Sequence, residues 1–557
     1  MKYIICVVAI IIFLIIISKK EEKRRMLVWR ERIRNAFGEV PEQEYTSEYF
    51  KGLQGYYQYK KVTKGDVDDI TFNDLDLKNI YMLLNNTESS VGEEYLYYVL
   101  RQLRFDKEEL LERDKVMEYF TQHEEERIKF QLIMSRLGKL PNLSVFTFMN
   151  RMKELKAYGL GQHYFCIGSL LVAFGILAVE PKIGILAVCL TIGNNIYQYY
   201  KRKGTVSDYF KILAFIVRLL RSVDELEKQD DPFLRPYVEK MIKVKQDFRY
   251  VKKNAKWISC GSSMNGSLLD SILDYERMLF HTDLIKFSRM VKLLNEKNDE
   301  LVMIYETIGF LESMLAAASF RQLLDFYSKP DLVPGVKPFI EATDLYHPLL
   351  DEPVTNSIKE KQNILVTGSN ASGKSTFIKT VAINAILSQT IYTSTSHGYR
   401  GNYYRVFTSM ALRDDIFNNE SYYIVEIKSL KRILDAVDEE TPILCFVDEV
   451  LRGTNTLERI AASAQILRSL SKGYVLCMAA THDIELTYIL ERYYSNYHFQ
   501  EEVVDNDVLF DYRLCNGRAQ SRNAIKLLGM IGYKQEIIDQ ATKAANDFLN
   551  TGTWETI

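Results

Sequence analysis

The hydrophobic positions of the chain begin with one unbroken apolar run. Residues 3–17 are all apolar, and Ser18 is followed by the basic residues Lys19, Lys20, Lys23, Arg24 and Arg25. A cleaved signal peptide has its charge before the apolar run and small residues after it, whereas the heavier charge here comes second. We therefore predict a membrane anchor over residues 1–25, with its basic end on the cytoplasmic side. A cleaved signal is the alternative.

A second apolar region occupies residues 161–200. Its runs at 165–179 and 183–192 carry no charge and are separated only by Glu180, Pro181 and Lys182. Basic residues flank both sides, at Arg151, Lys153, Lys156, Lys201, Arg202 and Lys203. Because basic flanks favour the cytoplasmic side, the pattern predicts a transmembrane hairpin with its turn outside. Each run is short for a span, and a hairpin buried in a soluble core is the alternative.

Outside these runs, apolar residues recur every three or four positions, as in amphipathic helices. The pattern covers residues 106–137, 206–228 and 268–327. We predict a long α-helical scaffold, with a first part over residues 26–160 and a second part over residues 201–332.

The pattern changes after Lys329 and Pro330. Short apolar runs at 363–367, 443–447 and 474–480 alternate with helix-like stretches. Such alternation is typical of a parallel sheet covered by helices. Residues 333–557 are therefore predicted to form an α/β domain, and the fold class of the whole chain is mixed.

Composition narrows the class of protein further. The 557 residues include 71 basic and 73 acidic side chains, and the net charge of −2 excludes a uniformly basic nucleic-acid binder. Hydrophobic residues make up 47%, which excludes a wholly disordered chain. The seven cysteines are scattered, so they predict neither a disulfide framework nor a close-spaced zinc site and fit a reducing compartment.

The strongest motif is a glycine-rich loop between an apolar strand and a helix-like stretch. It consists of Gly368, Ser369, Asn370, Ala371, Ser372, Gly373, Lys374, Ser375 and Thr376. In this context the loop is a P-loop, whose backbone amides surround phosphate groups at a helix N-terminus. Lys374 can reach the β- and γ-phosphates of ATP, and the Ser375 hydroxyl can join the shell of a Mg²⁺ ion.

An acidic pair supplies the second half of this chemistry. Asp448 and Glu449 end the apolar run that begins at Ile443, so both are expected at the carboxyl edge of the sheet. There Asp448 can hold the metal through water, and Glu449 can orient or deprotonate the attacking water. His482 follows the next strand-like run and can sense the γ-phosphate or polarise the water.

Three segments together resemble the ATPase core of MutS-family proteins. They are residues 367–376, residues 480–487, and Asp448-Glu-Val-Leu-Arg-Gly-Thr-Asn-Thr456. Residues 86–101, 308–330, 346–350 and 521–548 resemble further parts of the family in the same order. The resemblance covers residues 300–550 well and 65–135 weakly. It implies an ABC-type P-loop ATPase domain that uses ATP and Mg²⁺, an ATP-dependent homodimer, and DNA as the partner.

The resemblance also implies a site shared between two subunits. In the family, a serine of one subunit completes the nucleotide site of the other, and Ser421 occupies the matching position. Residues 418–420 replace the small, glycine-containing stretch that usually precedes this serine. Leu451 stands where the family usually has glycine, so the loop packing near the dimer interface is expected to differ.

The N-terminal part departs from the family. Members that recognise mismatches carry a separate domain there, with a Phe-x-Glu wedge that enters DNA. Phe37, Gly38 and Glu39 match these three letters without a surrounding domain, and we expect no mismatch reading from them.

One segment of the helical scaffold is strongly basic. It contains Lys240, Lys243, Lys245, Arg249, Lys252, Lys253 and Lys256, with Phe248, Tyr250 and Trp257 interleaved. Three interpretations stay open: a surface that tracks nucleic-acid phosphates, a surface for anionic lipid, and an ordinary solvated helix face.

The sequence thus predicts a membrane-tethered MutS-like ATPase whose catalytic domain faces the cytoplasm and whose ATP-driven dimer closure acts on DNA. The alternative is a membrane-coupled ATPase switch that acts on a protein or lipid partner without DNA. Transport is disfavoured, because the predicted spans contain no charged residue that resembles a substrate path.

Overall fold

The computed structural model describes most of the chain and divides it into two compact units. The described residues are 17, 20, 21, 23–60, 64–152, 160–254, 268–369, 372–410, 422–452, 454–504, 507–519, 525, 528, 532–554 and 556. The first unit comprises Met1–Lys60, Asn85–Tyr98 and Val116–Ser319, and the second comprises Lys61–Leu84, Val99–Lys115 and Phe320–Ile557. Most of the predicted N-terminal anchor lies outside the described residues.

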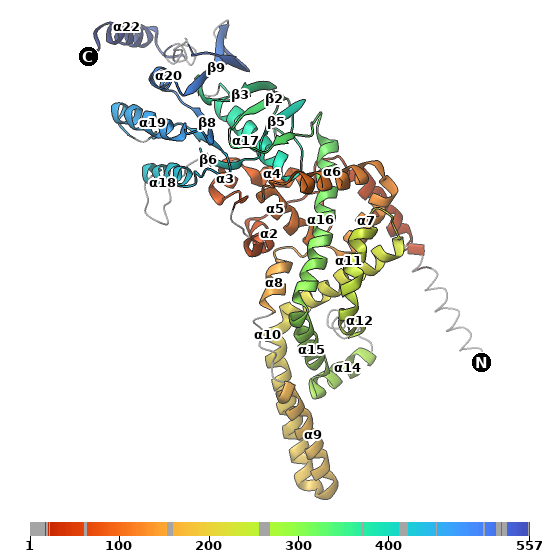
Figure 1. The fold of residues 1–557 in the computed structure, drawn as a ribbon. Helices are drawn as coiled ribbons and strands as arrows, with labels where there is room; N and C mark the ends of the chain where they lie inside the picture. The colour runs from red at the N-terminus through yellow and green to blue at the C-terminus, as the bar shows by residue number, and fades with distance from the viewer. Residues whose placement is uncertain are drawn as a thin grey trace. The chain divides into compact units, whose positions relative to one another are not determined.

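Every element of regular secondary structure that the structure describes in the first unit is a helix (Figure 1). Its elements are α2 (Ser47–Lys60), α7 (Glu124–Leu137), α8 (Val145–Arg151), α9 (Leu160–Val179), α10 (Pro181–Gln229), α11 (Arg235–Lys245), η1 (Gln246–Phe248), α12 (Arg249–Asn254), α14 (Leu268–Phe280), α15 (Thr282–Glu296), most of α5 (Ser90–Arg101) and α16 (Asn298–Leu323), and the C-terminal part of α6 (Lys107–Gln122), whose first part belongs to the second unit. The predicted helical scaffold is therefore confirmed.

Helix α16 supplies much of the core of this unit. Leu311 and Met314 are fully buried, and Glu312 is only 2% exposed. The backbone N–H groups of Glu88 and Ser89 donate to Oε1 of Glu312 at 2.6 and 2.8 Å. The carboxyl group thus lies at the N-terminus of α5, where unpaired N–H groups need an acceptor. Burial nevertheless raises the pKa of Glu312 to about 7.

The predicted hairpin at 161–200 appears as two antiparallel helices. α9 ends at Val179, and α10 begins at Pro181 and continues as one helix well past residue 200 (Figure 1). The helices pack closely near the turn, since a Cβ on Gly184 would lie 2.1 Å from Cα of Leu177. Among the described residues, α9 and α16 are long and apolar enough to cross a membrane, and α16 is mostly buried within the protein.

The second unit contains every strand that the structure describes. Its helices are α3 (Asp69–Asp74), α4 (Leu77–Leu84), α17 (Lys374–Thr390), α18 (Tyr422–Asp435), α19 (Thr456–Leu470), α20 (Ile484–Ile489) and α22 (Gln535–Thr551). Its strands are β1 (Asp331–Val333), β2 (Ile340–Leu345), β3 (Asn356–Glu360), β4 (Asn363–Thr367), β5 (Gly398–Asn402), β6 (Arg405–Ser409), β7 (Ile443–Asp448), β8 (Val475–Ala480), β9 (Tyr494–Val504) and β10 (Asp507–Asn516).

The larger sheet has six strands in the order β10-β9-β4-β8-β7-β6. All neighbours pair in parallel except β9 and β10, which form an antiparallel hairpin. β4, β7 and β8 are almost wholly buried, as expected for parallel strands covered on both faces. The predicted parallel α/β sheet is therefore confirmed, and its register places Asp448 beside Ala480.

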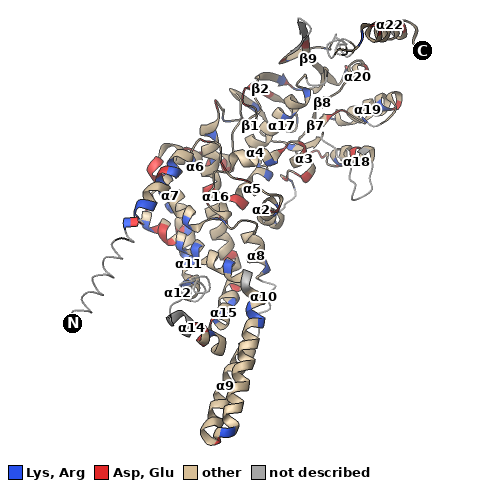
Figure 2. Ribbon diagram, turned by 180° about the vertical axis from the view of Figure 1, so that it is seen from behind, with Lys and Arg blue, Asp and Glu red and all other residues tan. Residues whose placement is uncertain are grey.

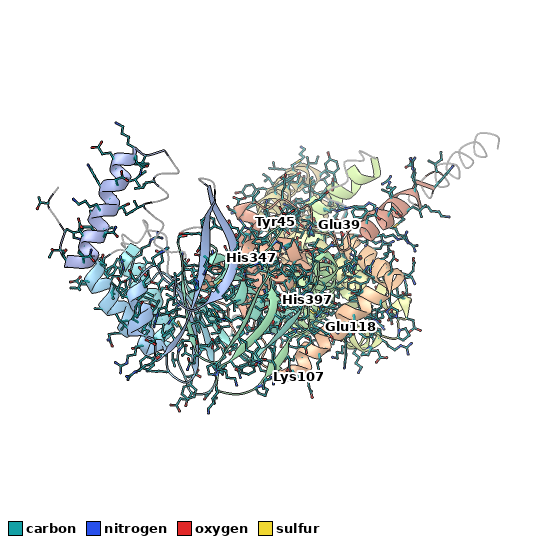
Figure 3. All side chains as sticks on the ribbon, turned by 90° about the horizontal axis from the view of Figure 1, so that it is seen from above. Glu39, Tyr45, Lys107, Glu118, His347 and His397 are labelled. Atoms are coloured by element: carbon teal, nitrogen blue, oxygen red, sulfur yellow. The ribbon has the colours of Figure 1, made fainter. Side chains whose placement is uncertain are left out.

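The smaller sheet has four strands in the order β1-β5-β2-β3. His347 follows β2, and His397 precedes β5 (Figure 3). The imidazole of His397 stacks on Phe326 with ring centroids 3.9 Å apart, and its Nδ1 lies 3.2 Å from Oδ2 of Asp344. These contacts fix the position of His397, the residue that immediately precedes β5.

Two buried arginines hold the far end of α17 within the second unit. Arg321 donates to the carbonyl oxygen of Tyr392 at 2.7 Å and pairs with Asp114 at 2.6 Å. Arg113 donates to the carbonyl oxygen of Thr390. The last carbonyl groups of a helix lack partners inside the helix, so these guanidinium groups satisfy them and fix α17 in place.

Candidate functional site

The glycine-rich loop leaves the sheet at β4 and enters α17. Gly368 has φ +147°, and a Cβ there would lie 2.8 Å from Oγ of Ser372. Gly373 caps α17 with φ +105°, a conformation that residues with a side chain rarely adopt. The two glycines thus allow the tight loop that brings the N-terminus of α17 to the carboxyl edge of the sheet.

Lys374 is the first residue of α17 and is 5% exposed. Its Nζ donates to the carbonyl oxygens of Gly368 at 2.9 Å and Ser369 at 2.6 Å. Burial lowers the pKa of Lys374, and the carboxylates of Asp448, Glu449 and Glu501 oppose this effect. A cation held inside a glycine-rich loop at a helix N-terminus is suited to bind phosphate.

Asp448 ends β7 next to the loop. Burial raises the pKa of Asp448, and a hydrogen bond from Ser375 opposes the rise. A carboxylate and a hydroxyl are hard oxygen ligands of the kind that Mg²⁺ prefers, so these two residues fit the ion. The described residues include no group of three or more His, Cys, Asp or Glu side chains that could hold a metal, so phosphate oxygens and water would complete the shell.

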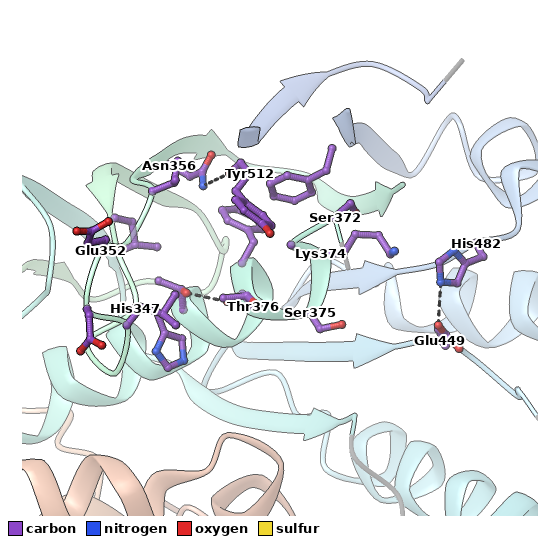
Figure 4. A pocket seen from close by; sticks show the side chains of 18 residues that line it. His347, Glu352, Asn356, Ser372, Lys374, Ser375, Thr376, Glu449, His482 and Tyr512 are labelled. Carbon is purple, nitrogen blue, oxygen red and sulfur yellow. Dashed lines mark hydrogen bonds and ion pairs between the residues drawn. The ribbon is translucent and has the colours of Figure 1, made fainter. Parts of the chain in front are cut away.

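Both oxygens of Glu449 have partners. Nε2 of His482 lies 3.0 Å from Oε1 (Figure 4). Nε of Arg452 lies 2.8 Å from Oε2. The hydrogen bond to His482 lowers the pKa of Glu449, which keeps the carboxylate ionised at neutral pH. An ionised carboxylate next to a phosphate-binding loop can accept a proton from water.

The turn after Glu449 is held in an unusual conformation. Glu449 and Leu451 have φ +56° and +57°, in the left-handed region that costs energy for residues with a side chain. The Leu451 N–H donates to Oε1 of Glu426 on α18, and Glu426 is 2% exposed. Leu451 itself is buried in the core of the sheet. Leu451 therefore adopts a conformation typical of glycine. Its buried contacts and the hydrogen bond to Glu426 hold it there.

The turn that carries His482 has a separate brace. Arg459 on α19 forms two bonds to Asp483, with Nε 3.0 Å from Oδ2 and Nη2 2.6 Å from Oδ1. The Asp483 N–H donates to Oγ1 of Thr481 at 3.0 Å. A bidentate pair between a guanidinium and a carboxylate restricts the orientation of both groups as well as their distance. It therefore fixes the backbone at Asp483, next to His482.

A cavity of about 540 Å³ opens beside these residues. Lys374, Ser375, Glu449 and His482 line one side, as Figure 4 shows. Sequence reasoning missed the residues of the other side, which include His347, Asn356, Phe499 and Tyr512.

Asn356 on β3 orients the strand that carries Tyr512. Its Nδ2 donates to the carbonyl oxygen of Tyr512 at 3.0 Å, and its Oδ1 accepts from the Leu514 N–H at 2.7 Å (Figure 4). The pairing of β9 and β10 is irregular between Phe510 and Leu514, and the Tyr512 ring lies 3.2 Å from the position of a Cβ on Gly373. The ring offers an aromatic face to a planar ligand in the cavity.

Some predicted residues stay predictions. Asn370, Ala371 and Ser421 lie outside the described residues, so the loop tip and the shared serine are not placed. The rest of the P-loop, with Asp448, Glu449 and His482, converges at one edge of the sheet.

The basic segment is less free than its sequence suggests. Lys245 lies 2.9 Å from Asp224, Lys252 pairs with the same carboxylate, and Phe248 is fully buried. Lys240, Lys243, Arg249 and Lys253 remain exposed. Lys256 and Trp257 lie outside the described residues. The exposed part of the segment is smaller than the sequence suggests, and the three interpretations stay open.

Phe37 is used inside the first unit. The guanidinium carbon of Arg127 lies 3.7 Å from the centroid of its ring, and the Gly38 N–H donates to Oγ of Ser319 at 2.9 Å. Phe37 and Gly38 thus make contacts within the first unit, and the expectation that the Phe-x-Glu match is not a DNA wedge stays a prediction.

Comparison with known proteins finds a family that matches the segment containing the candidate site. Residues 364–549 match the model of MutS domain V. The chain is 29% identical to the DNA mismatch repair protein MutS of Pseudothermotoga lettingae over 266 residues, which is 45% of this chain and 32% of that protein. It is 26% identical to the protein of the same name from Methanosarcina acetivorans over 272 residues, 46% of this chain and 30% of that protein.

A mouse protein gives a third match of similar extent. MutS protein homolog 4 of Mus musculus is 29% identical over 267 residues, which is 44% of this chain and 27% of that protein. The matches thus span about a third of the length of the curated relatives.

Proposed function

We propose that this chain, which belongs to the MutS family through residues 364–549, binds ATP with Mg²⁺ and hydrolyses it in its second unit. The observation that carries the proposal is the convergence of Lys374, Ser375, Asp448, Glu449 and His482 beside one cavity. Phosphate binding, a hard-metal site and a general base are the parts that phosphoryl transfer to water requires.

Each residue has a defined task in the proposed reaction. Lys374 leaves its loop carbonyls to neutralise the β- and γ-phosphates, and the N–H groups at the start of α17 bind the same oxygens. Ser375 and Asp448 would hold Mg²⁺, which would supply positive charge to neutralise the phosphates. Glu449 accepts the proton of the attacking water, and His482 keeps its carboxylate oriented. The base of the nucleotide fits against Tyr512.

Hydrolysis tests this part directly. We expect the full-length chain, solubilised in detergent, to release phosphate from ATP in the presence of Mg²⁺ and to stop when the metal is chelated. A chain that retains its helix content but releases no phosphate under any metal condition would contradict the proposal.

We further propose that two chains close on ATP as a homodimer and that closure acts on DNA. The curated relatives named DNA mismatch repair protein MutS support the DNA part, and the exposed lysines Lys240 and Lys253 offer phosphate contacts. Anisotropy of labelled duplex DNA, matched and mismatched, tests this with and without ATP at two salt concentrations. We expect affinity that depends on ATP and falls with salt, and equal affinity for both duplexes.

The second candidate function is a membrane-coupled ATPase switch without DNA. The observation that favours it is the exposed apolar surface of the α9–α10 hairpin. If the chain hydrolyses ATP but binds no DNA at low salt, with or without ATP, the result would support this second function.

A further inference from the structure

The hairpin formed by α9 and the first part of α10 exposes apolar side chains along its length. On α9 the exposed large residues beyond Tyr164 are Phe165, Leu171, Val172, Phe174, Ile176 and Val179, with exposed fractions from 36% at Ile176 to 85% at Val179. Residues of the same kind continue the surface over positions 183–190 of α10. A continuous exposed surface of large apolar side chains marks an interaction site.

The exposed residues surround the hairpin rather than form one face. The buried residues of α9 are His163, Cys166, Leu170 and Ala173, a stripe that recurs every three or four positions as expected for packing on α10. The exposed apolar residues occupy the remaining arc of about 200°, at 3.6 residues per turn. A second copy would cover one side of this surface, whereas lipid covers every side. We propose that the hairpin inserts, turn first, into a lipid bilayer.

Two hydroxyl groups in the apolar part of the hairpin are satisfied by their own helices. Oγ of Ser169 donates to the carbonyl oxygen of Cys166 at 2.9 Å, and Oγ1 of Thr191 donates to that of Ala187 at 2.9 Å. In hydrocarbon every polar group needs a partner inside the protein, and these two hydroxyls need none from water.

The two ends of the apolar surface have the composition of membrane interfaces. The turn carries Glu180 and Lys182, and Figure 2 shows the hairpin free of charged residues from there to its root. At the root, Tyr164, Tyr197 and Tyr200 are 45%, 63% and 55% exposed. Exposed tyrosines gather at the level of lipid headgroups, where the ring is apolar and the hydroxyl is hydrated.

These ends set the depth of insertion. Tyr164 lies about 24 Å along α9 from the turn, at 1.5 Å per residue. On α10 the first exposed amide side chain is nearer the turn, at Asn194, about 18 Å away. The hydrocarbon core of a bilayer is about 30 Å thick, so the turn passes the midplane and reaches the far headgroups where the bilayer thins locally.

The basic residues behind the tyrosines set the orientation. Lys201, Arg202 and Lys203 follow directly on α10. Basic residues next to a span stay on the cytoplasmic side, so the root of the hairpin, with the ATPase chain attached, faces the cytoplasm. This inference rests on the hairpin alone and does not depend on nucleotide binding.

Depth-dependent quenching tests the inference on the full-length chain. Val172, 63% exposed in the middle of the hairpin, is changed to Trp, and the chain is reconstituted into vesicles of phosphatidylcholine and phosphatidylglycerol. The matched control is Leu457→Trp on α19, where the native side chain is 80% exposed. Both variants keep residues 3–17, so a tether at the N-terminus acts equally on both. The parent chain supplies the signal of its three native tryptophans.

Lipid brominated near the middle of the acyl chain should remove most of the emission added by Val172→Trp and leave that of Leu457→Trp unchanged. Adding Leu171→Asp and Leu190→Asp to the first variant should restore the emission, since two charges at these exposed positions oppose insertion. Lys374→Ala should leave the quenching unchanged. Failure of the ATPase proposal can therefore be distinguished from failure of the hairpin to insert.

Two outcomes would overturn the inference. Absence of quenching in Val172→Trp would show that the hairpin is outside the bilayer, and oxidative cross-linking of the exposed Cys189 between chains would then assign the surface to a second copy. Equal quenching of both variants would show that the signal does not come from the hairpin. Circular dichroism of each variant confirms that the helices are retained.

Discussion

The candidate nucleotide site and the α9–α10 hairpin depart from the usual distribution of side chains in opposite ways. In the site, ionisable groups are buried: Lys374 is 5% exposed and Glu426 is 2% exposed. In the hairpin, large apolar groups such as Val179 are exposed. Buried charge and exposed apolar surface are both costly, so each arrangement marks a place where the protein meets something other than water.

Helix α16 shows what the ordinary distribution looks like. Its most apolar stretch has a mean hydropathy of 1.5, close to the 1.7 of α9, yet 72% of that stretch is buried against 22% for α9. The two helices pass the same test of length and composition and differ in what covers them. Hydropathy alone therefore does not separate a buried core helix from a helix with an exposed apolar surface, whereas burial does.

The largest expected effect comes from the base in the nucleotide site. Glu449→Gln removes the proton acceptor but keeps the size of the side chain, so turnover should fall about 100-fold or more while ATP affinity is retained. Phosphate release and binding of a fluorescent ATP analogue measure the two quantities. A variant that hydrolyses ATP at the parent rate would assign the base to another residue.

A pair of matched substitutions contrasts α16 with α9. Leu311→Ala, at a fully buried position, should lower the free energy of unfolding by about 2–5 kcal/mol through lost contacts and a cavity. Leu171→Ala, at a position 62% exposed, should change it by less than about 0.5 kcal/mol. Denaturant unfolding of the full-length chain in detergent measures both. Equal losses would mean that the hairpin surface is covered within the protein.

Sequence patterns predicted some of these features and missed others for a physical reason. The P-loop, Asp448, Glu449 and His482 are adjacent to strand-like runs, so local sequence places them at one edge of the sheet. Asn356 and Tyr512 reach the cavity only because β10 bends beside β3, and Glu426 reaches the turn after Glu449 from α18. These contacts depend on tertiary packing. No spacing rule along the chain could reveal them.

A smaller effect is expected from substitution of Glu426. This residue does not contact the reacting groups and acts on them only by holding the turn after Glu449. Glu426→Ala removes the acceptor of the Leu451 N–H, so turnover should fall about tenfold with little change in KM, because the turn relaxes from its left-handed conformation. Glu426→Gln keeps an oxygen for this N–H and should recover most of the rate. Failure of Gln to recover it would mean that the charge, not the hydrogen bond, is needed.

The smallest effect is a pH dependence in the first unit. Burial raises the pKa of Glu312 from 4.5 to about 7, so the folded chain binds a proton that the unfolded chain has released between these values. The contribution of this group to stability is therefore complete below about pH 4.5 and declines as pH rises towards 7. Unfolding across this range should show the decline in the parent chain and a smaller one in Glu312→Gln. An equal slope in both would assign the dependence to other groups.

The central claim is that the second unit binds ATP through Lys374, and one pair of variants tests it most directly. Lys374→Ala removes the cation of the loop. Lys361→Ala removes an exposed lysine just before β4, at the end of that strand opposite to the loop. Binding of ATP with Mg²⁺ to the full-length chain should weaken about 100-fold in the first variant, as expected from the loss of charged hydrogen bonds to phosphate, and stay unchanged in the second. Equal affinities in both variants would contradict the account.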